Sequence, residues 1–123
     1  MATTLAYGFS TVLDLLVLFI GARFLLVPRA AAAGYGVPAA PNGDPAYLTV
    51  KGVRDLASGV IGLALLVAVG LRAEAWYMLA VALVPLGDTV VVLRNGGTRA
   101  AAFGIHFATA VLVLADAAFL FTF

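Results

Sequence analysis

The stretch Leu48–Leu71 reads LTVKGVRDLASGVIGLALLVAVGL. It is long enough to cross a bilayer, which takes about 20 residues at 1.5 Å per residue, yet it carries Lys51, Arg54 and Asp55 near its start. Three further apolar stretches of similar length lie at Leu5–Val27, Ala75–Leu93 and Ala100–Phe121. The sequence therefore predicts four membrane-spanning helices.

The composition agrees with a membrane protein, because 64% of the 123 residues are hydrophobic and leave little polar surface for water. Short connections at Arg72–Glu74 and Arg94–Arg99 should place neighbouring helices antiparallel. We predict an all-α fold, an integral membrane four-helix up-down antiparallel bundle. Residues 1–123 would form this single transmembrane domain.

Several functional classes find no support in the residues. The absence of a basic run with interleaved aromatic residues gives no support to nucleic-acid binding, and without cysteine there is no disulfide or cysteine metal site. No nucleotide loop, nucleophile elbow or zinc motif is present. We therefore predict no cofactor and no metal.

The distribution of basic residues predicts the orientation. Arg29, Arg94 and Arg99 flank the first and third connections, whereas only Arg72 flanks the second. By the positive-inside rule the first and third connections face the cytoplasm and both termini lie outside. The expected location is the inner (plasma) membrane, as a multi-pass protein.

Charged side chains from all four predicted helices fall at a similar depth, about 6–12 Å below the cytoplasmic helix ends at 1.5 Å per residue. This charged layer comprises Arg23, Lys51, Arg54, Asp55, Asp88 and His106. A charge at the bilayer centre costs about 2.5–3.5 kcal/mol on translocon scales, so these side chains are expected to face inward.

Two other acids, Asp14 and Asp116, fall nearer the outer face. Asp14 precedes Arg23 by nine residues, which is about half a turn out of phase on a helix, so the two are not expected to face one cavity. A subunit contact, a relay toward outside water and a neutral hydrogen-bonded acid are all open for Asp14.

The charged layer has a structural and a functional interpretation. Lys51 and Asp55 at i,i+4 spacing, or Arg54 and Asp88, could simply pair between or along helices. Small residues such as Gly59 already supply close helix contacts, so the whole charged set exceeds what helix packing requires.

The charges of the layer favour an anionic ligand. Arg23, Lys51 and Arg54 outnumber Asp55 and Asp88, so we predict that the three cations bind a lipophilic anion. His106, oriented by Asp88 or assisted by Asp55, would transfer a proton as acid or base, giving His106, Asp88 and Asp55 as candidate catalytic residues.

The connection 28–47 is too long for a simple turn and lacks regular periodicity. It is expected to be either a lid over the cytoplasmic mouth or a flexible linker. Within it Tyr35, between Gly34 and Gly36, is a candidate substrate-binding residue.

A pattern of motifs resembles a known family of small membrane proteins. Its parts are Gly21-Ala-Arg-Phe24, Gly34-Tyr-Gly-Val-Pro38, Lys51-Gly-Val-Arg-Asp55, Pro85-Leu-Gly-Asp88 and His106. The family is domain of unknown function 4267, and the resemblance implies a four-helix integral membrane protein but no activity. A weaker similarity, to anthrone-oxygenase-like membrane proteins, implies cofactor-independent chemistry on aromatic polyketides.

We therefore expect a small membrane enzyme or binding protein for a lipophilic anionic or enolisable molecule, or a lipid. Isomerase, cyclase or cofactor-independent oxygenase chemistry would suit these residues. The alternatives are a proton-coupled transporter acting as a homo-oligomer, and an accessory subunit of a membrane complex.

Overall fold

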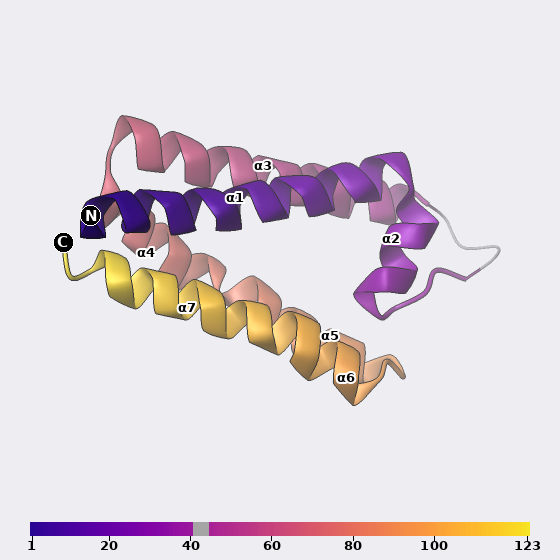
Figure 1. The fold of residues 1–123 in the computed structure, drawn as a ribbon. Helices are drawn as coiled ribbons and strands as arrows, with labels where there is room; N and C mark the ends of the chain where they lie inside the picture. Colours follow the sequence, from indigo (N-terminus) through magenta and orange to yellow (C-terminus); the bar gives the residue numbers. More distant parts are fainter. Residues whose placement is uncertain (41–44) are drawn as a thin grey trace.

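The computed structural model describes residues 1–40 and 45–123, and this part of the chain is almost entirely helical (Figure 1). In chain order the elements are α1 (Ala2–Leu26), α2 (Pro28–Tyr35), α3 (Ala46–Ala68), α4 (Leu71–Val81), α5 (Leu83–Arg94), α6 (Arg99–Ala101), the π-helix η1 (Ala102–Phe107) and α7 (Ala108–Leu120). No strand occurs in the two described ranges. The all-α class is confirmed.

The predicted third helix differs from the observed one at its start and its middle. The residues Arg72–Glu74, predicted as a connection, form the first turn of α4, because the chain already turns at Gly70 with a φ of 123°. Helix α4 then ends at Val81, four residues before Pro85. Proline lacks an N–H, and its ring clashes with the carbonyl of the residue four positions earlier, here Val81. This explains the break between α4 and α5.

The prediction of an irregular segment at 28–47 is wrong for its first part, which forms α2; residues 41–44 lie outside the described ranges. Val27, held out of the helical region by the following proline, ends α1, and Pro28 starts α2 at its first position. Gly36 ends α2 with a φ of 103°. The structure thus contains more helices than the four predicted.

The long helices form two groups, visible in Figure 1. Helices α1 and α3 run side by side, and α7 with η1 contacts α4 and α5. Both termini lie at one end of the molecule, and α2 lies at the opposite end. We call these two ends the terminal end and the α2 end.

The contact between α1 and α3 depends on glycines. A Cβ added at Gly21 would lie 2.8 Å from the Gly52 carbonyl oxygen, and one added at Gly59 would lie 2.8 Å from the backbone oxygen of Asp14. The two backbones therefore touch directly, as the predicted small-residue contacts of α3 require.

Three helical stretches are long and apolar enough to cross a membrane: Ala2–Leu26, Leu71–Arg94 and Arg99–Leu120. Large apolar side chains such as Leu26, Val67 and Leu83 are exposed on the outside of the molecule. These features identify a membrane protein. Helix α3, with 23 residues, has a comparable length and carries three charged residues in its first half, Lys51, Arg54 and Asp55.

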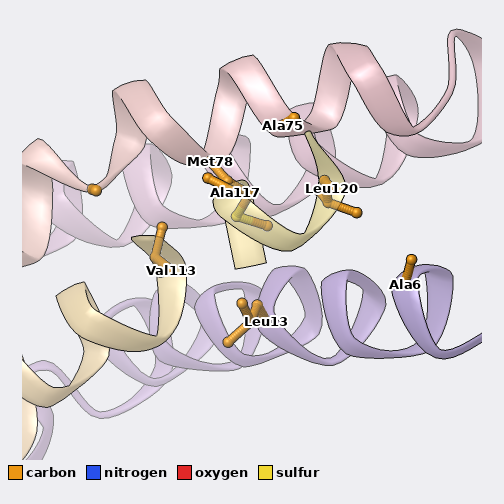
Figure 2. Close-up of a cluster of buried hydrophobic side chains, with 8 residues drawn as sticks. Ala6, Leu13, Ala75, Met78, Val113, Ala117 and Leu120 are labelled. Carbon is orange, nitrogen blue, oxygen red and sulfur yellow. The ribbon is translucent and has the colours of Figure 1, made fainter. Parts of the chain in front are cut away.

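A hydrophobic core fills the terminal end between α1, α4 and α7 (Figure 2). Its buried side chains are Ala6, Leu13, Ala75, Met78, Ala82, Val113, Ala117 and Leu120. At the α2 end, a smaller core of Phe24, Ala31 and Ala32 joins α1 to α2. Between these two apolar regions lies the cavity described next.

Candidate functional site

A cavity of about 800 Å³ lies between the two helix groups and reaches α2. Its walls are mostly apolar, with contributions from α1, α2, α3, α4, α5, η1 and α7. Every candidate site residue predicted from the sequence lines it, namely Arg23, Tyr35, Lys51, Arg54, Asp55, Asp88 and His106. The predicted charged layer is thus one contiguous lining.

Lys51 is held by neighbours within the protein. Its Nζ lies 2.6 Å from Oδ2 of Asp55 on the same helix, and it lies over the rings of Phe24 and Tyr35 at 4.7 and 4.6 Å. The i,i+4 pairing considered for these two residues is therefore present. Lys51 is largely neutralised, so it differs from the free anion-binding cation that the sequence predicted.

Arg23 and Arg54 have no such partner. Both side chains are exposed to the cavity, and within residues 1–40 and 45–123 neither forms a hydrogen bond or an ion pair. The alternative pairing of Arg54 with Asp88 is not formed. Nη1 of Arg23 lies 3.9 Å from the Cβ position of Gly34, which places this guanidinium beside α2. Two unpaired guanidinium groups thus line a mainly apolar cavity.

His106 is positioned by the π-helix η1 and is buried. Its Nε2 lies 2.6 Å from the backbone oxygen of Tyr35. A carbonyl oxygen only accepts, so Nε2 carries the hydrogen and Nδ1 holds the lone pair of the neutral ring. Isolated π-turns are frequent at functional sites because they redirect a side chain within a helix.

The role of Asp88 differs from the expected one. Its Oδ2 lies 4.0 Å from Nδ1 of His106, too far for a direct hydrogen bond, so the Tyr35 carbonyl orients the imidazole instead. The gap leaves Nδ1 available to a ligand or a water molecule. Asp88 also contacts the Tyr35 phenol, and burial together with Asp88 raises the pKa of that phenol.

Tyr35 connects α2 to the site. Its ring lies 4.1 Å from the His106 ring and 5.9 Å from the Phe24 ring, centroid to centroid. The end of α2 contacts α5 and α6, since a Cβ at Gly36 would lie 3.3 Å from Val92. Helix α2 is therefore an ordered wall of the cavity that carries Tyr35.

Asp14 also lines this cavity, contrary to the helix-phase expectation that separated it from Arg23. The cavity extends along α1, and the long Arg23 side chain reaches toward α2, so a half-turn difference in phase does not separate the two residues. Glu74, predicted to lie in a connection, is instead in the first turn of α4 and is buried with an exposed fraction of 0%.

The described residues contain no group of three or more His, Asp or Glu side chains arranged to hold a metal ion. Chemically the site offers two cationic hydrogen-bond donors, one imidazole lone pair and a phenol, set in an apolar cavity. Such a set can bind an anion and exchange a proton with it.

Comparisons with known proteins add the family. None of the curated proteins and none of the solved structures matches the chain. The similarity to anthrone-oxygenase-like proteins therefore stays a prediction. One family model matches residues 15–120, which include both helix groups and all of the cavity lining except Leu13 and Asp14. The chain belongs to the family described as domain of unknown function DUF4267, as its sequence motifs had indicated.

Proposed function

We propose that this protein binds a lipophilic anion in its membrane-embedded cavity and acts on it as a small membrane enzyme or holds it as a binding protein. The observation that carries the proposal is the pair Arg23 and Arg54, which lack partners among the described residues and line a mostly apolar cavity. A buried or lipid-facing guanidinium without a counter-charge is costly, and a bound carboxylate, phosphate, phenolate or enolate would offset that cost.

We place four antiparallel spans in the membrane in up-down order. They are the three long apolar stretches together with α3, which is the second span along the chain. Helix α3 has the required length, and its charges line the cavity instead of facing lipid. Arg94 and Arg99 lie where α5 ends and α6 begins. The positive-inside rule then puts this end, with α2, in the cytoplasm of a cell with an inner (plasma) membrane, and the termini outside.

The dimensions support a small amphiphile as ligand. Small-molecule sites typically measure about 300–1,000 Å³, and the cavity falls within that range. Its polar groups gather near α2, while apolar side chains such as Leu16, Val84 and Val113 cover much of the remaining wall. An acidic head group would contact the arginines and a hydrocarbon or aromatic body would fill the rest.

In the enzyme form of the proposal, Nδ1 of His106 removes a proton from a carbon next to a carbonyl group. Arg23 and Arg54 stabilise the negative charge that develops on the carbonyl oxygen, and the protonated imidazole returns the proton to another atom of the same molecule. Asp88, 4.0 Å from Nδ1, stabilises the imidazolium in between. These steps move one proton within the molecule and so amount to an isomerisation. In a cyclisation the enolate carbon would instead attack a second carbonyl carbon of the same molecule, and the oxygen of the opened C=O bond would take the proton from the imidazolium.

The decisive experiment compares three purified proteins: wild type, Arg54→Ala, and Arg94→Ala as a control cation outside the cavity. Co-purifying small molecules are identified by mass spectrometry, and binding of laurate is titrated by calorimetry in nonionic detergent. Loss of a charge-assisted hydrogen bond, about 1.5–3 kcal/mol, predicts affinity about 10–150-fold weaker for Arg54→Ala. Equal affinity in all three proteins would reject the anion site.

A proton-coupled transporter, acting as a homo-oligomer, is the second candidate. It is favoured by one observation, the extension of the cavity from the charged residues near α2 to Asp14. Laurate movement across liposomes containing the protein, driven by a pH gradient, would support transport. Binding without movement, in a protein that is strictly monomeric, would support the enzyme or binding function.

A further inference from the structure

Three acidic side chains from three helices meet at the terminal end of the molecule. Asp14 of α1, Glu74 of α4 and Asp116 of α7 have exposed fractions of 1%, 0% and 0%. We call them the carboxyl cluster. In the sequence Asp14 follows Leu13, Glu74 precedes Ala75 and Asp116 precedes Ala117. These three neighbours belong to the apolar core shown in Figure 2. The cluster is therefore enclosed by hydrocarbon.

The cluster has few donors to satisfy its oxygens. Ser10 donates to Oδ2 of Asp116 at 2.8 Å. Four other oxygens are buried and have no donor within the described residues: Oδ2 of Asp14, both oxygens of Glu74 and Oδ1 of Asp116. No ion pair within residues 1–40 and 45–123 involves these carboxyls. Buried carboxylates in this state would be strongly unfavourable.

The arrangement of Asp14 and Glu74 indicates how the cost is avoided. Their carboxyl groups lie close enough to interact electrostatically, and the unpaired oxygens belong to both. Ionised carboxylates only accept hydrogen bonds, whereas a protonated carboxyl also donates one, so neighbouring acids can satisfy each other only when protons are present. Gly62 of α3 lies directly against the Asp14 carboxyl and leaves no space for a side chain there. The geometry fits carboxyls that share protons.

The other groups around the cluster do not supply a cation. From α4 the Tyr77 hydroxyl lies nearby, but it donates to the backbone oxygen of Ser58 at 2.5 Å. The α3 side is formed by Gly62, and α1 adds Ser10. Arg72 is exposed and lies over the Phe121 ring at 5.6 Å. Protons are thus the charge compensation that these surroundings permit.

We propose that Asp14, Glu74 and Asp116 form a proton-binding site that exchanges its protons with the cavity through Asp14. Asp14 belongs both to the cluster and to the cavity lining, to which Ser58, Tyr77 and Thr109 contribute further hydroxyl-bearing residues. The exchanged proton passes between a carboxyl oxygen of Asp14 and water or an acidic ligand in the cavity. The site does not depend on the identity of the proposed anion.

The test is infrared spectroscopy of the carboxyl C=O stretch in purified protein at neutral pH. Only six acidic side chains occur in the chain, so assignment is practical. We expect protonated-carboxyl bands that weaken in Asp14→Asn, Glu74→Gln and Asp116→Asn, but persist in Asp88→Asn, a cavity carboxyl outside the cluster. The substitutions preserve side-chain size, and the wild-type spectrum alone already shows whether such bands exist.

Exchange is tested by transferring the folded wild type into D₂O. A rapid shift of the band lost in Asp14→Asn supports exchange through the cavity. Three results would overturn the proposal: no protonated carboxyl at neutral pH, bands that shift only after unfolding, or bands that vanish when Na⁺ replaces a bulky organic cation. The last would identify a sodium site. Laurate binding is measured separately, so failure here is distinct from failure of the anion site.

Discussion

Substitution of Gly21 by alanine should weaken both the fold and the site. The added Cβ would lie 2.5 Å from the backbone nitrogen of Leu56 and 2.8 Å from the backbone oxygen of Gly52. Ordinary van der Waals contact begins near 3.4 Å, so α1 and α3 must separate by about 0.9 Å. The atoms in contact are backbone, which cannot move aside as a flexible side chain would.

The magnitude follows from two opposing effects. Overpacking of a closely packed contact costs about 1–3 kcal/mol, whereas replacing glycine by alanine within a helix gains about 0.5–1 kcal/mol. We expect net destabilisation of about 1–2 kcal/mol. Gly21 and Gly52 each precede an arginine of the cavity, Arg23 and Arg54, by two residues. Separation of the helices should therefore also weaken laurate binding.

Unfolding is measured by titration with SDS in mixed micelles, followed by circular dichroism. The matched control is Gly8→Ala, in the same helix, where a Cβ would meet nothing within 4 Å. This control should be as stable as wild type or slightly more stable. If Gly21→Ala and Gly8→Ala unfold at the same SDS fraction, the close glycine contact does not hold α1 and α3 together.

Three further predictions concern the cavity. Lys51→Met should destabilise the protein by about 3 kcal/mol because it leaves Asp55 buried without its partner, and adding Asp55→Leu should restore most of the loss in SDS unfolding. Unchanged stability of Lys51→Met would show that this ion pair is not structural. Nitrogen NMR of His106 should find a hydrogen on Nε2, and a ring protonated on Nδ1 alone would contradict its bond to the Tyr35 carbonyl. Because the folded-state pKa of Tyr35 is raised, the folded form is favoured while this phenol is neutral, and stability should fall as pH rises above about 10. Tyr35→Phe should lose less stability than wild type over this range, and an equal loss would show that Tyr35 does not contribute.

The sequence was sufficient to predict the helical class and the charged lining, because both depend on composition and on depth along a helix. Arg23, Arg54, Asp88 and His106 lie at similar distances from their helix ends, and the structure brings them to one cavity. Which charges are paired could not be predicted. The Lys51 ammonium group lies over the Phe24 ring, and this contact depends on how α1 and α3 pack.

The missed features have different physical origins. Helix α2 had a local signal, since Pro28 precedes an alanine run that ends at Gly34, and proline is favoured at a first helical position. This signal is weak because the segment has no apolar periodicity. Glu74 had no local signal, because its burial requires α4 to meet α1 and α7. The π-turn at His106 likewise depends on tertiary packing.

The protonation of the carboxyl cluster should influence how strongly the cavity binds an anion. Asp14 and Arg23 are nine residues apart, about 14 Å along α1. At an effective dielectric constant of about 20, an ionised Asp14 would attract Arg23 by about 1.2 kcal/mol and repel a bound anion by a similar amount. Affinity for the anion would then fall about sevenfold for each carboxyl ionised at that distance. Protons on the cluster thus preserve the positive charge of the cavity, and anion affinity should decrease with rising pH in wild type but less so in Asp14→Asn.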